Sequence, residues 1–179
     1  ETAINMVKHK VYGLDEYYTN FDPGSGGALD AAIAGAFKKG KPVFSYYWTP
    51  TGLMGKVDLV QLDEPAYDNA CWTKMMAVVE KIKADGPDAY TDTCASAYVN
   101  MALTKSASTT FANKKSNKKI IDFVRAYSVP TPDVNRSLAF YMDESGGDME
   151  ATAKHFLSNT GMWTKWVPAD VAAKVKDTL

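Results

Sequence analysis

The stretch KPVFSYYWTP, residues 41–50, decides how the rest of the sequence is interpreted. Its first part is almost continuously apolar or aromatic, which is typical of a β-strand covered on both faces. It ends in three consecutive aromatic residues, Tyr46, Tyr47 and Trp48, before a Thr-Pro stop. Because open α/β sheets bind ligands beyond the carboxyl ends of their strands, this position favours a binding role for the three rings.

The aromatic row has two interpretations. An indole face attracts a cation through the ring quadrupole, and quaternary ammonium groups suit such a surface, with about 0.5–2 kcal/mol for each contact. The alternative is structural. Tyr46 and Tyr47 would face opposite sides of the strand, with at least one of them in the core, and Trp48 would cap the sheet edge.

A glycine-rich turn and a helix precede this stretch. Residues 28–40 carry apolar side chains at helical spacing and end at Gly40, which predicts a helix with a glycine end. Ser25, within GSGG, is the candidate N-cap residue. The N-terminus of a helix can offer free backbone N–H groups to an anion such as a carboxylate, but a turn of this kind is also a common structural feature.

The remaining segments alternate between strand-like and helix-like patterns of apolar residues. Further strands are predicted at residues 57–62 and 96–104. Helices are predicted at residues 2–13, 71–86, 117–129, 131–147, 148–160 and 168–179. Thr131 and Asp148 are the predicted N-cap residues of the fourth and fifth of these helices. This alternation predicts the α/β class with mainly parallel strand pairing.

Composition narrows the class of protein. The 179 residues carry a formal net charge of −1, which gives no reason to expect nucleic acid as a partner. The basic run KKSNKK, residues 114–119, precedes an apolar helix face and is interpreted as a solvated helix start. No apolar run approaches the roughly 18–20 residues that a membrane span needs.

The two cysteines, Cys71 and Cys94, do not form a CxxC redox or zinc pattern. In an oxidising compartment they would form one disulfide, adding about 3 kcal/mol of stability. The alternative is two buried free thiols, and the residues alone leave both open.

No catalytic pattern stands out in the sequence. The two histidines, His9 and His155, lie beside lysines in helical segments and are interpreted as surface residues. The sequence has no nucleophile elbow, no zinc-protease motif and no Walker-type phosphate loop. We therefore expect no enzyme, no cofactor and no metal site.

The segment GKPVFSYYWTPTGLMGKVDLVQLDEPAYD, residues 40–68, resembles the signature region of glycine betaine, proline betaine and choline substrate-binding proteins of ABC importers. The opening ETAIN and the ending MWTKWVPADVAAKVKDTL also resemble that family. The resemblance implies a type II periplasmic binding fold, whose two lobes have mainly parallel sheets and close on the ligand. It implies a quaternary ammonium ligand in an aromatic cage, an ABC transporter permease as partner, and contact with the membrane only through that transporter.

The family's conserved tryptophan corresponds to Trp48, which is expected to form a wall of the cage. Thr49 and Pro50 would position it, Tyr46 and Tyr47 are carried as neighbours, and Ser25 is a candidate polar contact. The expected localisation is periplasmic or extracellular, with a lipid anchor left open.

The resemblance also implies that this sequence is a C-terminal fragment, because family members are longer at the N-terminus. Residues 1–62 would belong to the second lobe, and residues 63–179 would cross the hinge and return to the first. The isolated fragment is expected to be incomplete as a binder.

Two other classes of function are compatible with the fold. An enzyme on the same fold would need a base near Trp48, and the nearest carboxylates in sequence are Asp58, Asp63 and Glu64. A binding protein for another zwitterion, such as an amino acid, would need an arginine for the carboxylate. The only arginines, Arg125 and Arg136, lie in helical segments far along the chain.

Overall fold

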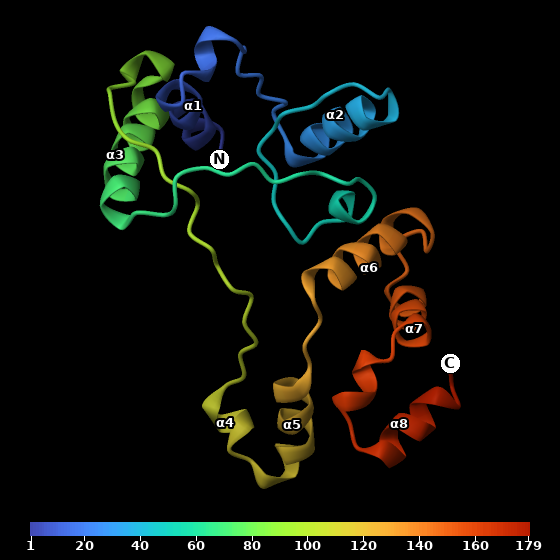
Figure 1. The fold of residues 1–179 in the computed structure, drawn as a ribbon. Helices are drawn as coiled ribbons and strands as arrows, with labels where there is room; N and C mark the ends of the chain where they lie inside the picture. Colours follow the sequence, from blue (N-terminus) through green and yellow to red (C-terminus); the bar gives the residue numbers. More distant parts are fainter. The chain divides into compact units, whose positions relative to one another are not determined.

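The computed structural model describes residues 1–179, and helices cover 56% of them, without any β-strand (Figure 1). The chain divides into two compact units. Unit 1 comprises Glu1–Tyr46 and Val60–Met101, and unit 2 comprises Tyr47–Leu59 and Ala102–Leu179. The predicted division at residue 62 into family lobes stays a prediction.

Unit 1 is built on the packing of two helices. Helix α1 (Thr2–Val11) lies against α3 (Asn69–Asp85), and Val7, Met75 and Val79 are fully buried between them. Full burial of such side chains stabilises a fold by about 1.5–3 kcal/mol each. Helix α2 (Gly26–Lys38) and two short 3-10 turns complete the unit.

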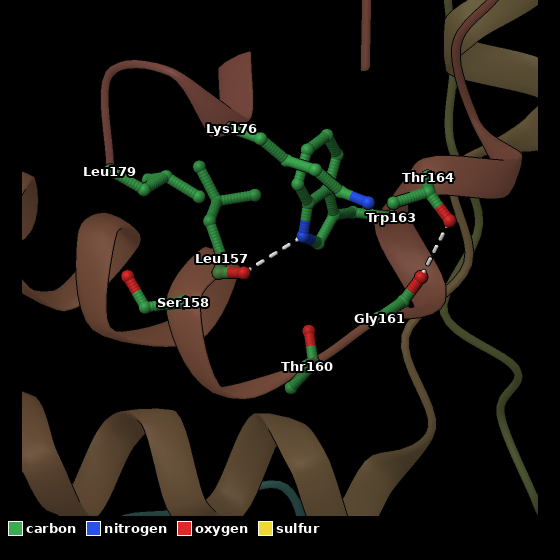
Figure 2. Close-up of a pocket in the computed structure, with 8 residues that line it drawn as sticks. All are labelled: Leu157, Ser158, Thr160, Gly161, Trp163, Thr164, Lys176 and Leu179. Carbon is green, nitrogen blue, oxygen red and sulfur yellow. Dashed lines mark hydrogen bonds between the residues drawn. The ribbon is translucent and has the colours of Figure 1, made fainter. Parts of the chain in front are cut away.

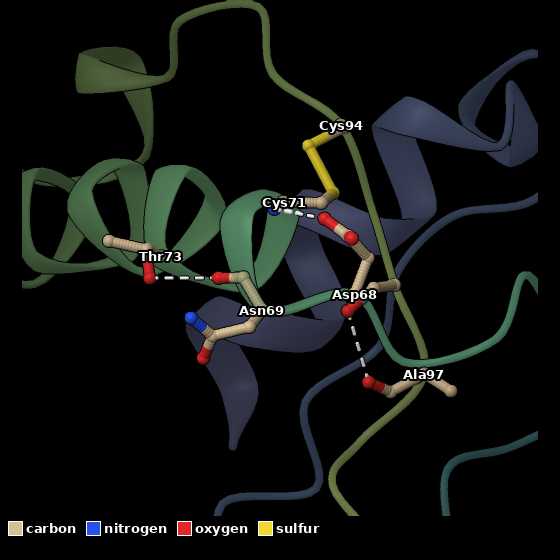
Figure 3. Close-up of a disulfide and its surroundings, with 7 residues drawn as sticks. Asp68, Asn69, Cys71, Thr73, Cys94 and Ala97 are labelled. Carbon is tan, nitrogen blue, oxygen red and sulfur yellow. Dashed lines mark hydrogen bonds between the residues drawn. A yellow bond between two sulfur atoms is a disulfide. The ribbon is translucent and has the colours of Figure 1, made fainter.

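A disulfide joins the first turn of α3 to the extended segment that follows it (Figure 3). Cys71 and Cys94 have Cα atoms 5.8 Å apart and are separated by 23 residues in sequence. The side chain of Asp68 caps α3 beside this bond by accepting a hydrogen bond from the N–H of Cys71 at 2.6 Å. The chain therefore has no free cysteine.

Unit 2 contains five helices and the turn that follows Trp48. The helices are α4 (Thr109–Ala112), α5 (Lys118–Ala126), α6 (Thr131–Asp143), α7 (Met149–Asn159) and α8 (Ala169–Lys176). The 3-10 turn Leu53–Gly55 and helix α7 both pack against α6. Trp163 is buried, and its indole N–H donates to the carbonyl of Leu157 at 2.8 Å.

The predicted helix signals are largely confirmed. Ser25 caps α2, with its Oγ accepting the N–H of Ala28 at 3.2 Å, and Gly40 follows that helix with a left-handed φ of 60°. Asp148 caps α7 through two backbone N–H groups. Local capping chemistry depends only on residues a few positions apart, so sequence alone can specify it.

The predicted α/β class with parallel sheets is wrong for this structure. The segments expected as strands, residues 42–48, 57–62 and 96–104, form no β-ladder. One backbone hydrogen bond joins the third of these segments to the loop that follows the second, from the N–H of Ala97 to the carbonyl of Pro65 at 2.9 Å. A strand exists only through hydrogen bonds to a neighbouring strand, whereas apolar composition reports only a preference for burial.

The side chains of these segments show the same departure. Apolar residues that a two-sided sheet would bury are exposed instead, among them Phe44, Val60, Leu62, Met101 and Leu103. The segments are apolar, as the sequence shows, but this apolar pattern does not make them paired strands.

Candidate functional site

Trp48 stands at the start of unit 2 with its ring partly open to solvent. Its side chain is 45% exposed, and its ring centroid lies 4.7 Å from that of Tyr47. The two ring planes are inclined at 31°, close to an offset stack. Tyr47 is half-buried, so the pair presents a mixed aromatic surface in which the indole is the more accessible member.

The turn after Trp48 is held by one buried amide on α6. The Thr49 hydroxyl and the Oδ1 atom of Asn135 are 3.2 Å apart, and the N–H of Thr51 donates to the same oxygen at 2.8 Å. Asn135 is 7% exposed. The Thr49–Pro50 peptide bond within this turn is cis. A buried amide that forms hydrogen bonds with two groups of a turn fixes the position of the turn relative to the helix. Because Trp48 directly precedes this turn, the same contacts restrict where its backbone can lie.

Two glycines let this turn approach α6 closely. A Cβ atom added at Gly55 would lie 2.3 Å from the backbone oxygen of Asn135 and 2.9 Å from Cβ of Ala139. At Gly52 it would lie 2.4 Å from Sδ of Met142. The first clash involves helix backbone, which cannot move aside, whereas the second involves the end of a flexible side chain. Gly55 is therefore the stricter requirement of the two.

Tyr46 belongs to a second group of aromatic residues, in unit 1. Its ring centroid lies 5.4 Å from that of Tyr98, and Tyr98 makes an edge contact with Trp72 at 5.6 Å. Tyr67 contacts Trp72 at 6.0 Å. Burial, followed by the nearby carboxylate of Glu1, raises the pKa of the Tyr46 hydroxyl. The structure thus assigns Tyr46 and Tyr47 to different units.

The unit 1 aromatic group already holds a cation of the chain itself. The ammonium of Lys8 lies 4.1 Å from the centroid of the Tyr98 ring and 2.8 Å from Oε2 of Glu64. Lys8 is nearly buried. The Tyr12 hydroxyl donates to the same carboxylate at 2.9 Å. Burial, then the hydrogen bond and charge of Glu64, raise the pKa of Tyr12. Glu64 is therefore engaged in two structural contacts.

The other predicted site residues are placed as follows. Thr49 lies in the anchored turn beside Trp48 and Tyr47, so these three residues are brought together in unit 2. Ser25 lies in unit 1, where its hydroxyl caps α2, and its contact with a ligand stays a prediction. Asp58 and Asp63 have exposed side chains.

A cavity of about 520 Å³ lies elsewhere in unit 2, between α7, the following 3-10 turn and the chain's last residues (Figure 2). Its lining combines the Trp163 ring and aliphatic groups with hydroxyls and one ammonium. The polar atoms of Trp163 and Thr164 are already engaged with backbone carbonyls. The lining residues are Leu157, Ser158, Thr160, Gly161, Trp163, Thr164, Lys176 and Leu179. None of the predicted site residues lies there.

Comparison with known families identifies the class of this protein as the substrate-binding component of an ABC transporter. The chain belongs to the family described as the substrate binding domain of ABC-type glycine betaine transport system, whose model matches residues 3–159. This confirms the resemblance noted in the sequence. Neither a search of curated proteins nor a search of solved structures gave a match.

Membership of this family indicates the general role and location of the protein. Proteins of this family bind a small substrate and deliver it to an ABC transporter permease, and their role is binding, not catalysis. They act in the periplasm or outside the cell. None of the helices in this structure has the length and apolar character required to cross a bilayer.

Sequence reasoning missed the residues that support the site. Asn135 was absorbed into a predicted helix, and nothing in its neighbourhood distinguishes it from a surface amide. Gly52 and Gly55 sit in a stretch with turn composition, but only the structure shows the helix that requires them. Tyr98 was placed in a predicted strand, and the partner cation Lys8 is 90 residues away in sequence.

Proposed function

We propose that the chain binds a quaternary ammonium solute, such as glycine betaine, choline, carnitine or proline betaine, at the Trp48–Tyr47 surface. The trimethylammonium group would lie against the exposed face of the Trp48 indole, with Tyr47 as a second wall. The observation that supports this most strongly is that Trp48 is 45% exposed and directly precedes a turn that a buried amide, Asn135, holds through Thr49 and Thr51.

The chemistry of the ligand matches the surface. A quaternary nitrogen spreads its positive charge over methyl groups and donates no hydrogen bond, so its best partner is a polarizable ring face. Each ring contact contributes about 0.5–2 kcal/mol, depending on how completely water is excluded. Restricting the backbone next to Trp48 lowers the entropy that would otherwise be lost when the ligand orders the ring.

Thr49 has a positioning role in this proposal. Its hydroxyl contacts Asn135 and therefore helps to hold the turn, so it supports Trp48 without touching the solute. Tyr46 contributes to the aromatic group of unit 1, where Lys8 already lies over Tyr98. An internal ammonium on a tyrosine face shows the same type of contact that we propose for the solute.

Isothermal titration of the full-length gene product separates charge from shape. Glycine betaine would be compared with 3,3-dimethylbutanoate, in which a carbon replaces the quaternary nitrogen and the remaining shape is kept. We expect saturable heat for glycine betaine and at least about tenfold weaker binding of the carbon isostere, which keeps the carboxylate but has no cation. Glycine, whose ammonium needs hydrogen-bond acceptors, is expected to bind weakly as well.

The same titrations contain the outcome that would overturn the proposal. Equal affinities for glycine betaine and its carbon isostere would mean that the site recognises an apolar shape. Saturable binding of glycine in preference to glycine betaine would assign the chain to another zwitterion.

A further inference from the structure

The start of α5 carries a dense cluster of cationic side chains. Between residues 114 and 125 there are five cationic side chains and a single carboxylate, in a chain whose formal net charge is −1. The carboxylate, Asp122, pairs with Lys118 within the same helix. The cationic residues are all exposed and are Lys114, Lys115, Lys118, Lys119 and Arg125. Such a cluster creates a local positive potential that the overall charge conceals.

Helix α5 also leaves apolar side chains outside the core. Ile121 is buried, whereas Ile120 is 52% exposed and Phe123 is 38% exposed. Residues three and four positions apart lie on one side of a helix, so Ile120, Phe123 and the C-cap residue Tyr127 form a partly exposed stripe beside the buried one. The rings of Phe123 and Tyr127 also contact Trp166. Lys119 borders this stripe, which makes the helix both basic and amphipathic.

Neighbouring residues extend and fix this surface. Phe111 of α4 is also 39% exposed, and its carbonyl accepts a hydrogen bond from Nδ2 of Asn117 at 2.9 Å, which ties α4 to the start of α5. A cavity of about 370 Å³ opens beside Phe123 and Tyr127. The ammonium of Lys105 borders it and donates to the carbonyls at the C-terminal end of α5.

We propose that this surface, defined by Lys114, Lys115, Lys118, Lys119, Ile120 and Phe123 and called the α5 face below, docks directly on a bilayer rich in anionic phospholipid. The lysines contact the phosphate headgroups, and Ile120 and Phe123 enter the interfacial region. The sequence predicted contact with the membrane only through the transporter, so this contact would be an additional one.

Charge complementarity selects this partner. A helix that combines clustered lysines with exposed apolar side chains binds in the plane of a bilayer surface, and its affinity rises with the anionic lipid content. A neutral protein groove would match the apolar stripe but would leave Lys114, Lys115 and Lys119 without counter-charges, since only Lys118 is paired, with Asp122. The α5 face lies outside the Trp48 turn, so the inference does not depend on which solute the chain binds.

Vesicle flotation tests the proposal directly. The full chain would be mixed with vesicles of phosphatidylcholine alone or with about one third phosphatidylglycerol, at low and high salt. We expect flotation only with the anionic vesicles and a loss of at least about tenfold in the partition coefficient at high salt, because salt screens exposed charges.

Matched variants assign the effect to the α5 face. Replacing Lys114, Lys115, Lys118 and Lys119 with glutamine is expected to lower the partition coefficient at least about tenfold. The control removes four exposed lysines of unit 1 (Lys38→Gln, Lys39→Gln, Lys41→Gln and Lys74→Gln), which alters the net charge equally, and is expected to retain binding. Ile120→Gln tests the apolar contribution without changing charge. Circular dichroism checks that each variant keeps its helices.

Three results would overturn the proposal. One is the absence of flotation with anionic vesicles at low salt. A second is equal binding to neutral vesicles, or an equal loss in the control variant, which would mean that net charge and not this face is responsible. The third is a concentration-dependent dimer that Ile120→Gln abolishes while vesicle binding is unchanged, which would assign the face to a second copy of the chain.

Discussion

Oδ1 of Asn135 accepts hydrogen bonds from the hydroxyl of Thr49 at 3.2 Å and from the backbone N–H of Thr51 at 2.8 Å. One buried amide on α6 therefore fixes both sides of the cis Thr49–Pro50–Thr51 turn. Trp48 precedes this turn directly, so the position of the accessible indole depends on a residue 87 positions later in the chain. The relationship links packing in unit 2 to the proposed binding surface.

Asn135→Ala should destabilise the chain because it leaves the partly buried N–H of Thr51 without its acceptor. We expect a loss of about 1–3 kcal/mol in the free energy of unfolding, measured by urea denaturation. Asn159→Ala is the matched control, because Asn159 is exposed and its amide bonds within its own helix. A loss of more than about 0.5 kcal/mol in the control would contradict the role of Asn135 in holding the turn. An unchanged free energy of unfolding in Asn135→Ala would contradict it as well.

Gly55→Ala should be more harmful than an alanine elsewhere in the chain. Its Cβ would collide with the backbone of α6, and we expect a loss of about 1–3 kcal/mol from overpacking. Gly35→Ala in α2 provides the comparison, because nothing lies within 4 Å of its added Cβ and alanine favours a helix. Thermal denaturation of both variants should give shifts of opposite sign. Equal shifts would mean that the turn is not held against α6.

Removing the disulfide should destabilise unit 1. Cys71 and Cys94 are separated by 23 residues. A disulfide that closes a loop of that size restricts the unfolded chain and so raises the free energy of unfolding by about 3 kcal/mol. The variant with both cysteines replaced by serine should therefore unfold at lower urea concentration. Mass measurement before and after thiol alkylation, without a reductant, checks that the bond forms. Alkylation of both cysteines in the folded chain would contradict the pairing.

The Tyr12–Glu64 contact predicts loss of stability at high pH. The pKa of the Tyr12 hydroxyl is raised above its ordinary value of about 10 by burial and then by Glu64. The folded state therefore holds this proton more tightly than the unfolded state. The resulting stability is present below a pH of about 10 and is lost as pH rises above it.

Urea denaturation as a function of pH measures this effect. Tyr12→Phe should flatten the decline in unfolding free energy above pH of about 10, whereas Tyr17→Phe, at a side chain that is 77% exposed, should leave it unchanged. The pKa of Tyr98 is raised as well, mainly by burial, so some decline should persist in the Tyr12 variant. A profile that rises above pH 10 would contradict the sign of the argument.

Sequence reasoning succeeded where the determining interactions are local. Ser25 and Asp148 were identified as helix caps because the hydroxyl or carboxylate needs only a partner two or three residues away. Thr131 was expected to cap α6, yet it is the first residue of that helix and Pro130 is the cap. The error of one position arises because Pro130 and Pro132 both favour a helix start.

Sequence reasoning failed where distant segments had to meet. The apolar residues Phe44, Val60 and Leu103 indicated strands, but no property of a single segment specifies the segment that pairs with it. The same limit explains why the sequence does not reveal the hydrogen bond between Asn135 and Thr49. In contrast, the family was identified correctly because its signature is contiguous, from residue 40 to residue 68.

The measurement that tests the central claim most directly is the affinity for glycine betaine of two variants at one position. Trp48→Phe keeps an aromatic face, and Trp48→Leu replaces it with an aliphatic side chain of moderate size. Isothermal titration of the full-length gene product should show a modest loss for phenylalanine. For leucine we expect a loss of up to about 30-fold, corresponding to about 2 kcal/mol of cation–π attraction. Equal affinities of both variants and the unaltered protein would contradict a binding role for Trp48.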